Sequence, residues 1–337
     1  MGAKFRVLIT DRPWLDSRIE REILSDISAE VIEAPSEDEA TLVSLARSAD
    51  AIATCWAKVM SPVIEAAEHC RIVCRMGIGL DNIAVETATR RGIPVTNVPA
   101  YCVDEVSDHT LALMLACLRK VALYHARTKS GEYALQAGPP MRRLSTLTLG
   151  LIGLGRTGRL VGRKAHALGM NVIACMRSRN GAGSPASDDG ADRSGTGFPC
   201  QFVSLEELLA RSDVVSLHAP LTDETDRLIG REQFALMKPS AYLINTSRGG
   251  LIDHAALEEA LGANRLAGAG LDVFSPEPPD LSQPLYRDER VIVTPHAAFL
   301  SEESLVDLRT CVAHQIKAAL TGGRPKHVVN PQFEQNR

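Results

Sequence analysis

Short apolar runs alternate with stretches of helical spacing along most of the chain, and this pattern predicts an α/β fold. In the first hundred residues we expect strands at 5–10, 30–33, 51–54, 72–75 and 94–97. Helical spacing separates them, as at 37–48 and 63–68. Because strands that alternate with helices pair in parallel, this part is expected to form a small parallel sheet.

The rest of the chain repeats the alternation after a long amphipathic helix, expected over about 104–129, and a polar arm at 131–143. The expected strands are 146–152, 171–175, 214–217, 241–245, 268–273 and 291–294, with helices such as 159–168, 204–210 and 254–261. A last helix at 302–320 follows the completed sheet, so we expect the chain to cross back to the first domain. Residues 180–199 are rich in Gly, Ser and Asp, which predicts a mobile loop that cannot bury a core.

Three glycines after the strand expected at 146–152 have the spacing of a dinucleotide-binding fingerprint. Gly153 allows a tight turn, Gly155 lets a pyrophosphate approach the backbone, and Gly158 lets the next helix pack closely on the sheet. The N-terminus of that helix would then hold the phosphates. A purely structural turn is the alternative, but the strand before the glycines and the helix after them favour a nucleotide site.

Three polar residues follow the last expected strands, at the sheet edge where ligands bind in open α/β sheets. Arg248 presents a planar fork that can hold a carboxylate and polarise a carbonyl. Glu277, if it pairs with His296, would orient the imidazole, which could then act as an acid in ketone reduction and as a base in alcohol oxidation. Each residue alone has an alternative as a salt-bridge partner or a turn residue. Behind a dinucleotide fingerprint, the three together predict a 2-hydroxyacid dehydrogenase.

Composition narrows the partners and the location that this interpretation allows. The 337 residues fit two domains, and the net charge of −4 gives no electrostatic case for nucleic acid or an anionic membrane. No secretory leader, membrane-spanning run or Cys-x-x-Cys pair is visible, so we expect a cytoplasmic protein whose eight cysteines are reduced. No cluster has metal-ligand spacing, so no metal site is expected. The expected partner is a small molecule.

Ordered motifs over nearly the whole chain resemble the D-isomer-specific 2-hydroxyacid dehydrogenase family. They lie at 77–83, 92–99, 149–158, 218–222, 245–253, 270–274, 277–278 and 294–296. The stretches 101–109 and 296–304 are most similar to the branch of the C-terminal-binding proteins and their bacterial dehydrogenase relatives. This resemblance implies that Arg248, Glu277 and His296 are catalytic, with His296 as the proton donor.

The resemblance also implies a fold of two Rossmann-like, doubly wound parallel-sheet domains. Residues 1–102 and 297–337 would form a discontinuous, flavodoxin-like substrate-binding domain. Residues 103–296 would form an NAD(P)-binding domain inserted in it. In relatives the connector helix and the arm before the fingerprint make the dimer contact, so a homodimer is expected.

Further contacts with cofactor and substrate follow from the same resemblance. Asp272 would hold the nicotinamide carboxamide, and the backbone N–H groups of Ile78 and Gly79 would bind the substrate carboxylate. The residues expected at the cofactor are Gly153, Gly155, Arg156, Thr157, Gly158, Arg177, Ser178, Arg179, His218, Pro220, Thr225, Thr246, Ser247, Arg248, Asp272 and His296. The residues expected at the substrate are Trp56, Ile78, Gly79, Arg248 and His296.

The side chain of the substrate is not encoded in these motifs. In relatives that act on phosphoglycerate, the loop after the third strand supplies a basic residue, whereas here that loop holds only Lys58 and offers Trp56 as an apolar wall. We therefore expect a small nonphosphorylated 2-oxoacid such as glyoxylate or hydroxypyruvate. A phosphoglycerate dehydrogenase is one alternative. The other is a nucleotide-gated binding protein of the transcriptional corepressor type, against which the intact catalytic residues argue.

The strand at 171–175 indicates NADP(H) as the coenzyme. NAD-preferring folds of this kind end that strand with an Asp or Glu that repels a 2′-phosphate. Here Met176 is followed by Arg177, Ser178 and Arg179, which could pair with a phosphate. A similar Arg-Ser-Arg occurs in relatives that reduce glyoxylate and hydroxypyruvate with NADPH. NAD(H), with both arginines solvated, is the alternative.

Overall fold

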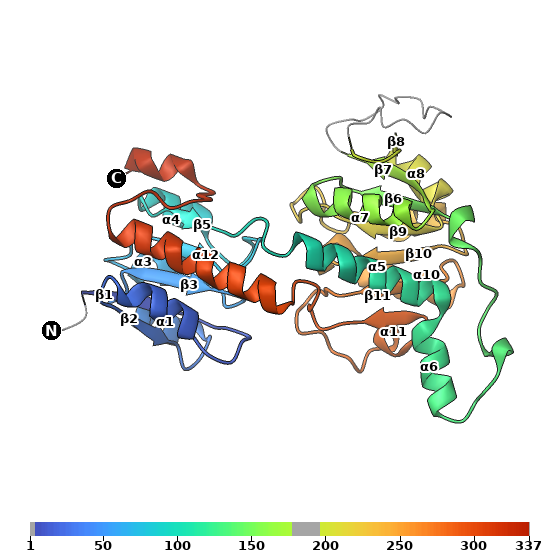
Figure 1. The fold of residues 1–337 in the computed structure, drawn as a ribbon, viewed down its shortest axis with the longest axis horizontal. Helices are drawn as coiled ribbons and strands as arrows, with labels where there is room; N and C mark the ends of the chain where they lie inside the picture. Colours follow the sequence, from blue (N-terminus) through green and yellow to red (C-terminus); the bar gives the residue numbers. More distant parts are fainter. Residues whose placement is uncertain (1–3, 177–195, 337) are drawn as a thin grey trace. The chain divides into compact units, whose positions relative to one another are not determined.

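The computed structural model describes residues 4–176 and 196–336, which form two compact units (Figure 1). The terminal unit combines both ends of the chain, through Tyr101 and again from Ser301. The central unit runs from Cys102 to Leu300. Among the described residues, no helix combines the length and the apolar character needed to cross a membrane.

The terminal unit is built on a parallel sheet of five strands in the order β2-β1-β3-β4-β5, which is the flavodoxin-like order. Its strands are β1 Phe5–Ile9, β2 Ala29–Glu33, β3 Ala51–Thr54, β4 Val73–Arg75 and β5 Val95–Thr96. Its helices are α1 Arg18–Ser25, α2 Glu39–Ala46, α3 Ser61–Ala66, α4 Val85–Arg90, α12 Glu302–Leu320 and the 3₁₀ segment Pro331–Asn336.

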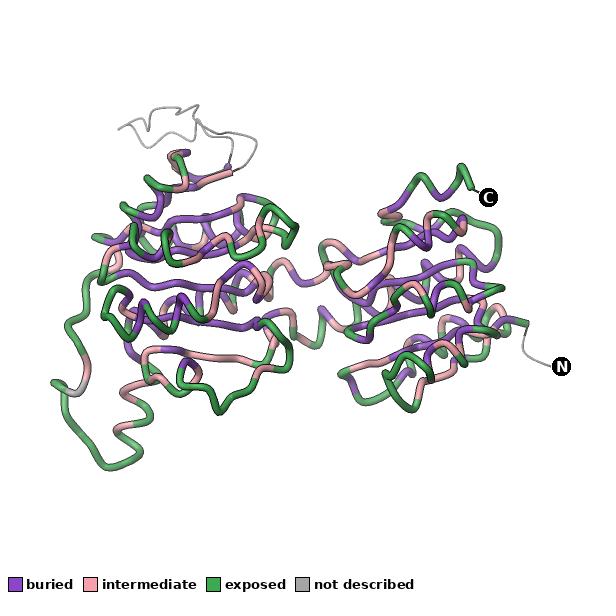
Figure 2. Tube along the Cα trace, turned by 180° about the vertical axis from the view of Figure 1, so that it is seen from behind, coloured by how far each residue is buried: buried purple, intermediate pink, exposed green. Residues whose placement is uncertain are grey.

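Helices cover both faces of the terminal sheet because alternate strand residues face opposite ways. Val7 and Ile9 pack with Leu308 of α12, whereas Leu8 packs with Leu42 of α2. The strands are buried along most of their length (Figure 2). The last helix of the chain therefore returns to the sheet formed by the first hundred residues, as the sequence predicts.

A buried ion pair fastens α12 to α1, which lie side by side (Figure 1). Arg309 Nε donates to Glu20 Oε1 at 2.8 Å and its Nη2 donates to Glu20 Oε2 at 2.7 Å. Both side chains are buried. Burial disfavours the charged form of Arg309, but its hydrogen bonds with Glu20 raise its pKa above the ordinary value.

The central unit has a parallel sheet of seven strands in the order β12-β11-β10-β9-β6-β7-β8. Its strands are β6 Thr148–Ile152, β7 Asn171–Cys175, β8 Gln201–Phe202, β9 Val214–Leu217, β10 Tyr242–Asn245, β11 Gly268–Leu271 and β12 Val291–Val293. Its helices are α5 Val103–Arg119, α6 Val121–Lys129, α7 Arg156–Ala167, α8 Leu205–Arg211, α9 Arg231–Leu236, α10 His254–Gly262 and α11 Pro284–Arg287. Short 3₁₀ segments occur at Leu135–Ala137, Leu144–Thr146 and Gly249–Leu251.

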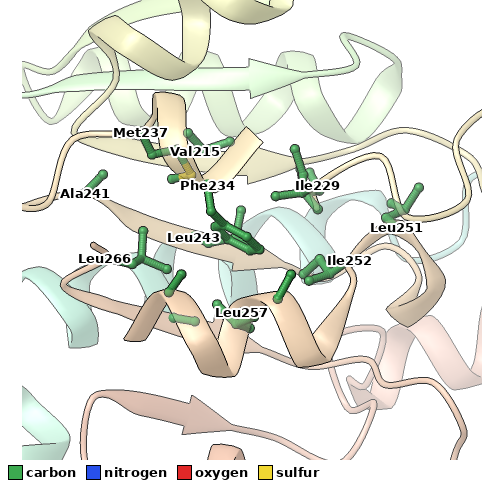
Figure 3. Close-up of a cluster of buried hydrophobic side chains, with 14 of the residues drawn as sticks. Val215, Ile229, Phe234, Met237, Ala241, Leu243, Leu251, Ile252, Leu257 and Leu266 are labelled. Atoms are coloured by element: carbon green, nitrogen blue, oxygen red, sulfur yellow. The ribbon is translucent and has the colours of Figure 1, made fainter. Parts of the chain in front are cut away.

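Counted from β6, this strand order is that of the dinucleotide-binding Rossmann fold with one added strand. Helices α8, α9 and α10 cover one face, where Phe234 and Leu257 pack near Leu243 (Figure 3). Helices α5 and α7 cover the other. The predicted fold class, two doubly wound parallel-sheet domains, is therefore confirmed.

The single helix expected over 104–129 is wrong, because it is broken at Lys120. This residue has a left-handed backbone with φ +58° and separates α5 from α6. Its ammonium group contacts the Tyr242 hydroxyl and lies 4.3 Å from the centre of that ring. Tyr242 is 122 positions away in sequence, so helical periodicity does not reveal this contact at the break.

Most of the loop expected at 180–199 lies outside the described residues. Its described end, 196–199, contains Phe198, which is buried in the core beside α7. A Cβ added to Gly162 would come within 2.3 Å of the Phe198 ring. The expectation that this stretch buries nothing is therefore wrong for its end.

Candidate active site

The glycine turn after β6 lies where the strand order reverses, since β6 pairs with both β7 and β9. Gly153 has φ +93°, and a Cβ there would meet the His218 carbonyl oxygen at 2.5 Å. A Cβ on Gly158 would lie 2.4 Å from the Gly153 oxygen. These two positions therefore require glycine for packing.

Gly155 differs, because a Cβ added there would meet nothing within 4 Å. It is the N-cap of α7, so it has no side chain to accept the N–H groups of the first turn. Arg156 and Thr157 are the first residues of that helix. Open space above an uncapped helix start suits a pyrophosphate, which accepts hydrogen bonds from the N–H groups and is attracted by the helix dipole.

His218 follows β9 and faces this turn from the neighbouring strand. Its Nε2 lies 2.9 Å from the Ser216 hydroxyl oxygen. Removal from water lowers the pKa of His218 to about 4, so the imidazole is neutral at physiological pH. Farther along the same loop, the Thr225 hydroxyl donates to the Pro220 carbonyl at 2.7 Å and closes a turn.

Residues after β10 are fixed by hydrogen bonds to neighbouring strands and to α5. The Ser247 hydroxyl donates to the Leu217 carbonyl at 2.8 Å, and the Thr246 hydroxyl lies 2.8 Å from that of Thr110. The Asn245 amide donates to the Arg248 carbonyl at 2.8 Å. Asn245 was not singled out from the sequence, where it reads as the polar end of a strand.

Glu277 and His296 are brought together, as the sequence predicts. His296 Nδ1 lies 2.8 Å from Glu277 Oε2, and Glu277 Oε1 accepts the Phe274 N–H at 2.7 Å. Burial opposes ionisation of this carboxyl, but the bonds from His296 and Phe274 and the charge of Arg248 bring its pKa below the ordinary value. Arg248, Glu277 and His296 follow the strands β10, β11 and β12, so all three lie at the carboxyl edge of the central sheet.

Asp272 is fully buried at the end of β11, and both of its carboxylate oxygens accept hydrogen bonds from the segment that carries His296. Oδ1 accepts the Thr294 hydroxyl at 2.6 Å and the Ala297 N–H at 2.8 Å, and Oδ2 accepts the Ala298 N–H at 2.9 Å. The contact with a nicotinamide carboxamide that the resemblance implies for Asp272 stays a prediction.

His109 on α5 joins this group, with Nε2 at 2.9 Å from the Thr294 hydroxyl oxygen and 3.5 Å from Asp272 Oδ1. From the sequence it is expected to be a packing or surface residue. Its neighbour Thr110 is buried, so His109 borders the face of α5 that meets β10 and β11. In the sequence, the only feature that could have indicated a role for His109 is a polar residue at the border of a buried helix face.

In the terminal unit, the loop that carries Trp56 is held from two sides. The Asp11 carboxylate accepts the Cys55 N–H at 2.8 Å and the Trp56 N–H at 2.6 Å. The Asn82 amide donates to the Ala57 carbonyl at 2.9 Å. Trp56 itself remains 40% exposed. Neither anchoring residue was predicted as part of the site.

The turn that contains Ile78 and Gly79 is fixed through its carbonyl groups. The Val98 N–H donates to the Gly77 carbonyl at 3.0 Å, and the Asn97 amide donates to the Ile78 carbonyl at 2.8 Å. The Arg75 side chain is buried beside this turn, because a Cβ on Gly77 would lie 2.6 Å from Arg75 Nη1. Sequence reasoning missed this arginine.

Two further predictions concern the residues expected at a 2′-phosphate and the absence of a metal site. Arg177, Ser178 and Arg179 lie outside the described residues. Within the ranges 4–176 and 196–336, no group of three or more His, Cys, Asp or Glu residues is arranged to hold a metal ion.

Comparison with known proteins matches the central unit to the family model for the NAD-binding domain of D-isomer-specific 2-hydroxyacid dehydrogenases, over residues 111–298. A D-3-phosphoglycerate dehydrogenase of Methanocaldococcus jannaschii is 39% identical over 326 residues; the match covers 96% of this chain and 59% of that protein. A glyoxylate reductase of Aeropyrum pernix is 38% identical over 86% of this chain and 85% of that protein. The solved structure of a glyoxylate reductase from Paecilomyes thermophila aligns with a TM-score of 0.85 at 28% identity, covering 98% of this chain and all of that one.

Proposed function

We propose, since this chain belongs to the D-isomer-specific 2-hydroxyacid dehydrogenase family, that it reduces a small nonphosphorylated 2-oxoacid with a nicotinamide coenzyme. The observation that carries the proposal is the 2.8 Å hydrogen bond between Glu277 and His296, at the carboxyl edge of the sheet that also bears Arg248 and the glycine turn. Glyoxylate and hydroxypyruvate are the favoured substrates.

In this mechanism His296 supplies the proton that the carbonyl oxygen gains on reduction. Glu277 holds Nδ1 of the ring, so Nε2 is the nitrogen directed to substrate. Arg248 binds the substrate carboxylate and polarises the carbonyl, which it can do as a fork with two parallel N–H bonds. The reduced nicotinamide supplies the hydride that reaches the carbonyl carbon. In the reverse direction His296 accepts the hydroxyl proton.

The residues of the glycine turn fit a dinucleotide. Gly155 leaves room beside the start of α7, where Arg156 and Thr157 would contact the pyrophosphate. Neutral His218, Pro220, Thr225, Thr246 and Ser247 would line the rest of the coenzyme.

NADP(H) is the proposed coenzyme. β7 ends at Cys175 without a following acidic residue, and Arg177, Ser178 and Arg179 supply two positive charges and a hydroxyl that suit a 2′-phosphate. NAD(H) is the alternative.

Trp56, Ile78 and Gly79 are the proposed substrate contacts in the terminal unit. Partly exposed Trp56 on a firmly anchored loop supports an apolar wall, and the exposed Lys58 is the only basic residue of that loop. Phosphoglycerate is the second candidate substrate, because buried Arg75 beside Gly77 offers a positive charge that the sequence argument did not weigh.

The test is a comparison of glyoxylate, hydroxypyruvate, pyruvate, phenylpyruvate and 3-phosphoglycerate with both coenzymes, by following nicotinamide absorbance. Turnover of glyoxylate or hydroxypyruvate with the highest kcat/KM supports the proposal. Efficient oxidation of 3-phosphoglycerate at micromolar KM would replace it with the phosphoglycerate alternative. Nucleotide-dependent assembly without turnover of any substrate would favour the corepressor-type alternative.

We also propose that the protein forms a homodimer and is cytoplasmic. Helix α6 has no buried residue, and the segment after it extends away from the central sheet (Figure 1). Tyr133 and Leu135 in that segment are 95% and 86% exposed, which suits a surface covered by a second copy. All eight cysteines are free thiols, as expected in a reducing compartment.

A further inference from the structure

We infer that His109 of α5 is a positioning residue for His296 and acts through the Thr294 hydroxyl and the Asp272 carboxylate. The inference rests on the proposed function, because it assumes that His296 is the proton donor. All four residues belong to the central unit, and each link in the chain between them is a short hydrogen bond.

The backbone of His296 needs external support. Its φ is +52°, a left-handed conformation that is unfavourable for a residue with a Cβ. The Asp272 carbonyl accepts the His296 N–H at 2.8 Å, while the Asp272 carboxylate accepts the next two N–H groups, of Ala297 and Ala298. Asp272 therefore holds three consecutive residues, and through them the direction of the imidazole.

The direction of the hydrogen bonds links His109 to Asp272. A Thr hydroxyl has one hydrogen, and Thr294 gives it to Asp272 Oδ1 at 2.6 Å. The Thr294 oxygen must then accept from His109, so Nε2 of His109 carries a hydrogen. His109 therefore donates to Thr294, and Thr294 donates to Asp272. In such a chain each hydrogen bond strengthens the next one.

Helix α5 is a firm base for this chain of bonds. It packs on β10 and β11, and the residue after His109, Thr110, contacts Thr246 at 2.8 Å. His109 therefore couples a rigid helix to the strained turn at the active-site edge. Removing it leaves an unpaired oxygen on Thr294 beside a buried carboxylate, and the turn can then relax away from the orientation that transfers the proton.

The test uses two matched pairs of variants. Thr294→Val removes the hydroxyl at nearly constant volume, and Thr294→Ser keeps it. His109→Leu removes the N–H donor and introduces a residue that favours helices. His109→Gln keeps an N–H donor. For each we would measure kcat and KM with glyoxylate or the preferred oxoacid, the Kd of the reduced coenzyme by its fluorescence, and Tm.

We expect Thr294→Val and His109→Leu to lower kcat by about tenfold or more, with coenzyme Kd within about twofold of wild type. Thr294→Ser and His109→Gln should keep kcat within about threefold. A pure packing role predicts that Tm and coenzyme affinity fall together with kcat, and this result would overturn the inference. Wild-type kcat in both Thr294→Val and His109→Leu would also overturn the inference.

The His296→Ala variant separates this inference from the proposed function. Loss of activity in His296→Ala together with wild-type activity in Thr294→Val and His109→Leu refutes only the role of His109. Wild-type activity in His296→Ala removes His296 from the mechanism, and with it the premise of this inference, whereas failure of the wild type to turn over any 2-oxoacid refutes the proposed function itself. If Thr294→Val fails to fold, His109→Leu at the partly exposed end of the chain of bonds still decides the question.

Discussion

At the residue scale, the candidate groups of each unit are side chains whose orientation is set by other residues. In the central unit Glu277 fixes His296 and Asp272 fixes the turn that carries it, and in the terminal unit Asp11 fixes the loop of Trp56. Such groups lose little freedom when a substrate binds, which is the requirement for efficient proton and hydride transfer. The proposed catalytic residues could be named from the sequence because the chemistry of the reaction requires an acid, a carboxylate partner and an anion-binding group. The supporting residues were not, because each acts on a loop far away in sequence.

Replacing His296 with Ala should lower kcat by about a hundredfold or more, because the proton donor is lost. Binding of the reduced coenzyme should change little, since the glycine turn lies on other strands. Steady-state kinetics and fluorescence titration measure the two effects. Near wild-type turnover would remove His296 from the mechanism.

Coenzyme choice depends on two residues in our proposal. The double variant Arg177→Ala, Arg179→Ala should lower kcat/KM for NADPH by about tenfold or more and leave that for NADH within about twofold. A matched control removes the same charge elsewhere, at the exposed Arg231 and Arg265. Preference of the wild type for NADH, or equal effects of both double variants, would contradict NADP(H) as the coenzyme.

At the element scale, the strands were predicted well where apolar runs have polar ends. β7 and β9 begin and end at the expected residues, as does α12. The two-residue β8 was missed, because so short a strand leaves no periodic signal. The break at Lys120 was missed because the apolar spacing continues across it, and the contact of Lys120 with Tyr242 on β10 is remote in sequence. Local patterns therefore predict elements that are stabilised locally and fail where tertiary contacts decide.

Asp213 joins three neighbouring elements at the start of β9. Its carboxylate accepts the Thr148 N–H at 2.9 Å and pairs with Arg142 at 2.8 Å and Lys238 at 3.0 Å. Asp213→Asn should reduce the free energy of unfolding by about 1 kcal/mol, because the buried carboxylate that pairs with the partly exposed Arg142 and Lys238 is replaced by an uncharged amide. Asp226→Asn, at an exposed and long ion pair, should change it by less than about 0.5 kcal/mol.

This effect has a defined pH dependence. Burial opposes ionisation of Asp213, yet the Thr148 N–H, Lys238 and Arg142 lower its pKa below the ordinary 3.8. A lowered carboxyl pKa gives stability that is complete above the ordinary value and is lost as the pH falls through the folded-state value. The difference between wild type and Asp213→Asn in urea unfolding should thus be full at neutral pH and shrink below about pH 4. A constant difference would argue against the charged pair.

The ion pair between α1 and α12 permits a sharper test of the terminal unit. Glu20→Gln should cost about 2 kcal/mol in unfolding free energy, because the buried Arg309 loses its buried counter-charge and keeps only the half-exposed Asp16 at 3.4 Å. Glu334→Gln removes an exposed pair with Arg324 and should cost less than about 0.5 kcal/mol. Equal small effects in denaturant unfolding would show that the buried pair contributes no more than an exposed one.

At the scale of the whole molecule, the sequence order of the elements decides how the two units are composed. The two ends of the chain share one sheet because apolar residues of α12 pack with those of β1 and α1. The sequence motifs fall at the carboxyl ends of the strands of both sheets. What the sequence does not contain is a direct signal for a second copy. That expectation depends on the resemblance and on exposed apolar groups.

A homodimer in solution is therefore the prediction at this scale. Tyr133 and Leu135 are almost fully exposed on a segment joined to α6, with the Tyr124 hydroxyl donating to the Leu135 carbonyl at 3.0 Å. If a second copy covers this surface, Leu135→Glu should place a charge in an apolar interface and shift the mass measured by light scattering from dimer to monomer. Leu15→Glu, at a residue 95% exposed in the terminal unit, is the matched control and should stay dimeric. A monomeric wild type, or a dimer unaffected by Leu135→Glu, would show that the segment has another role.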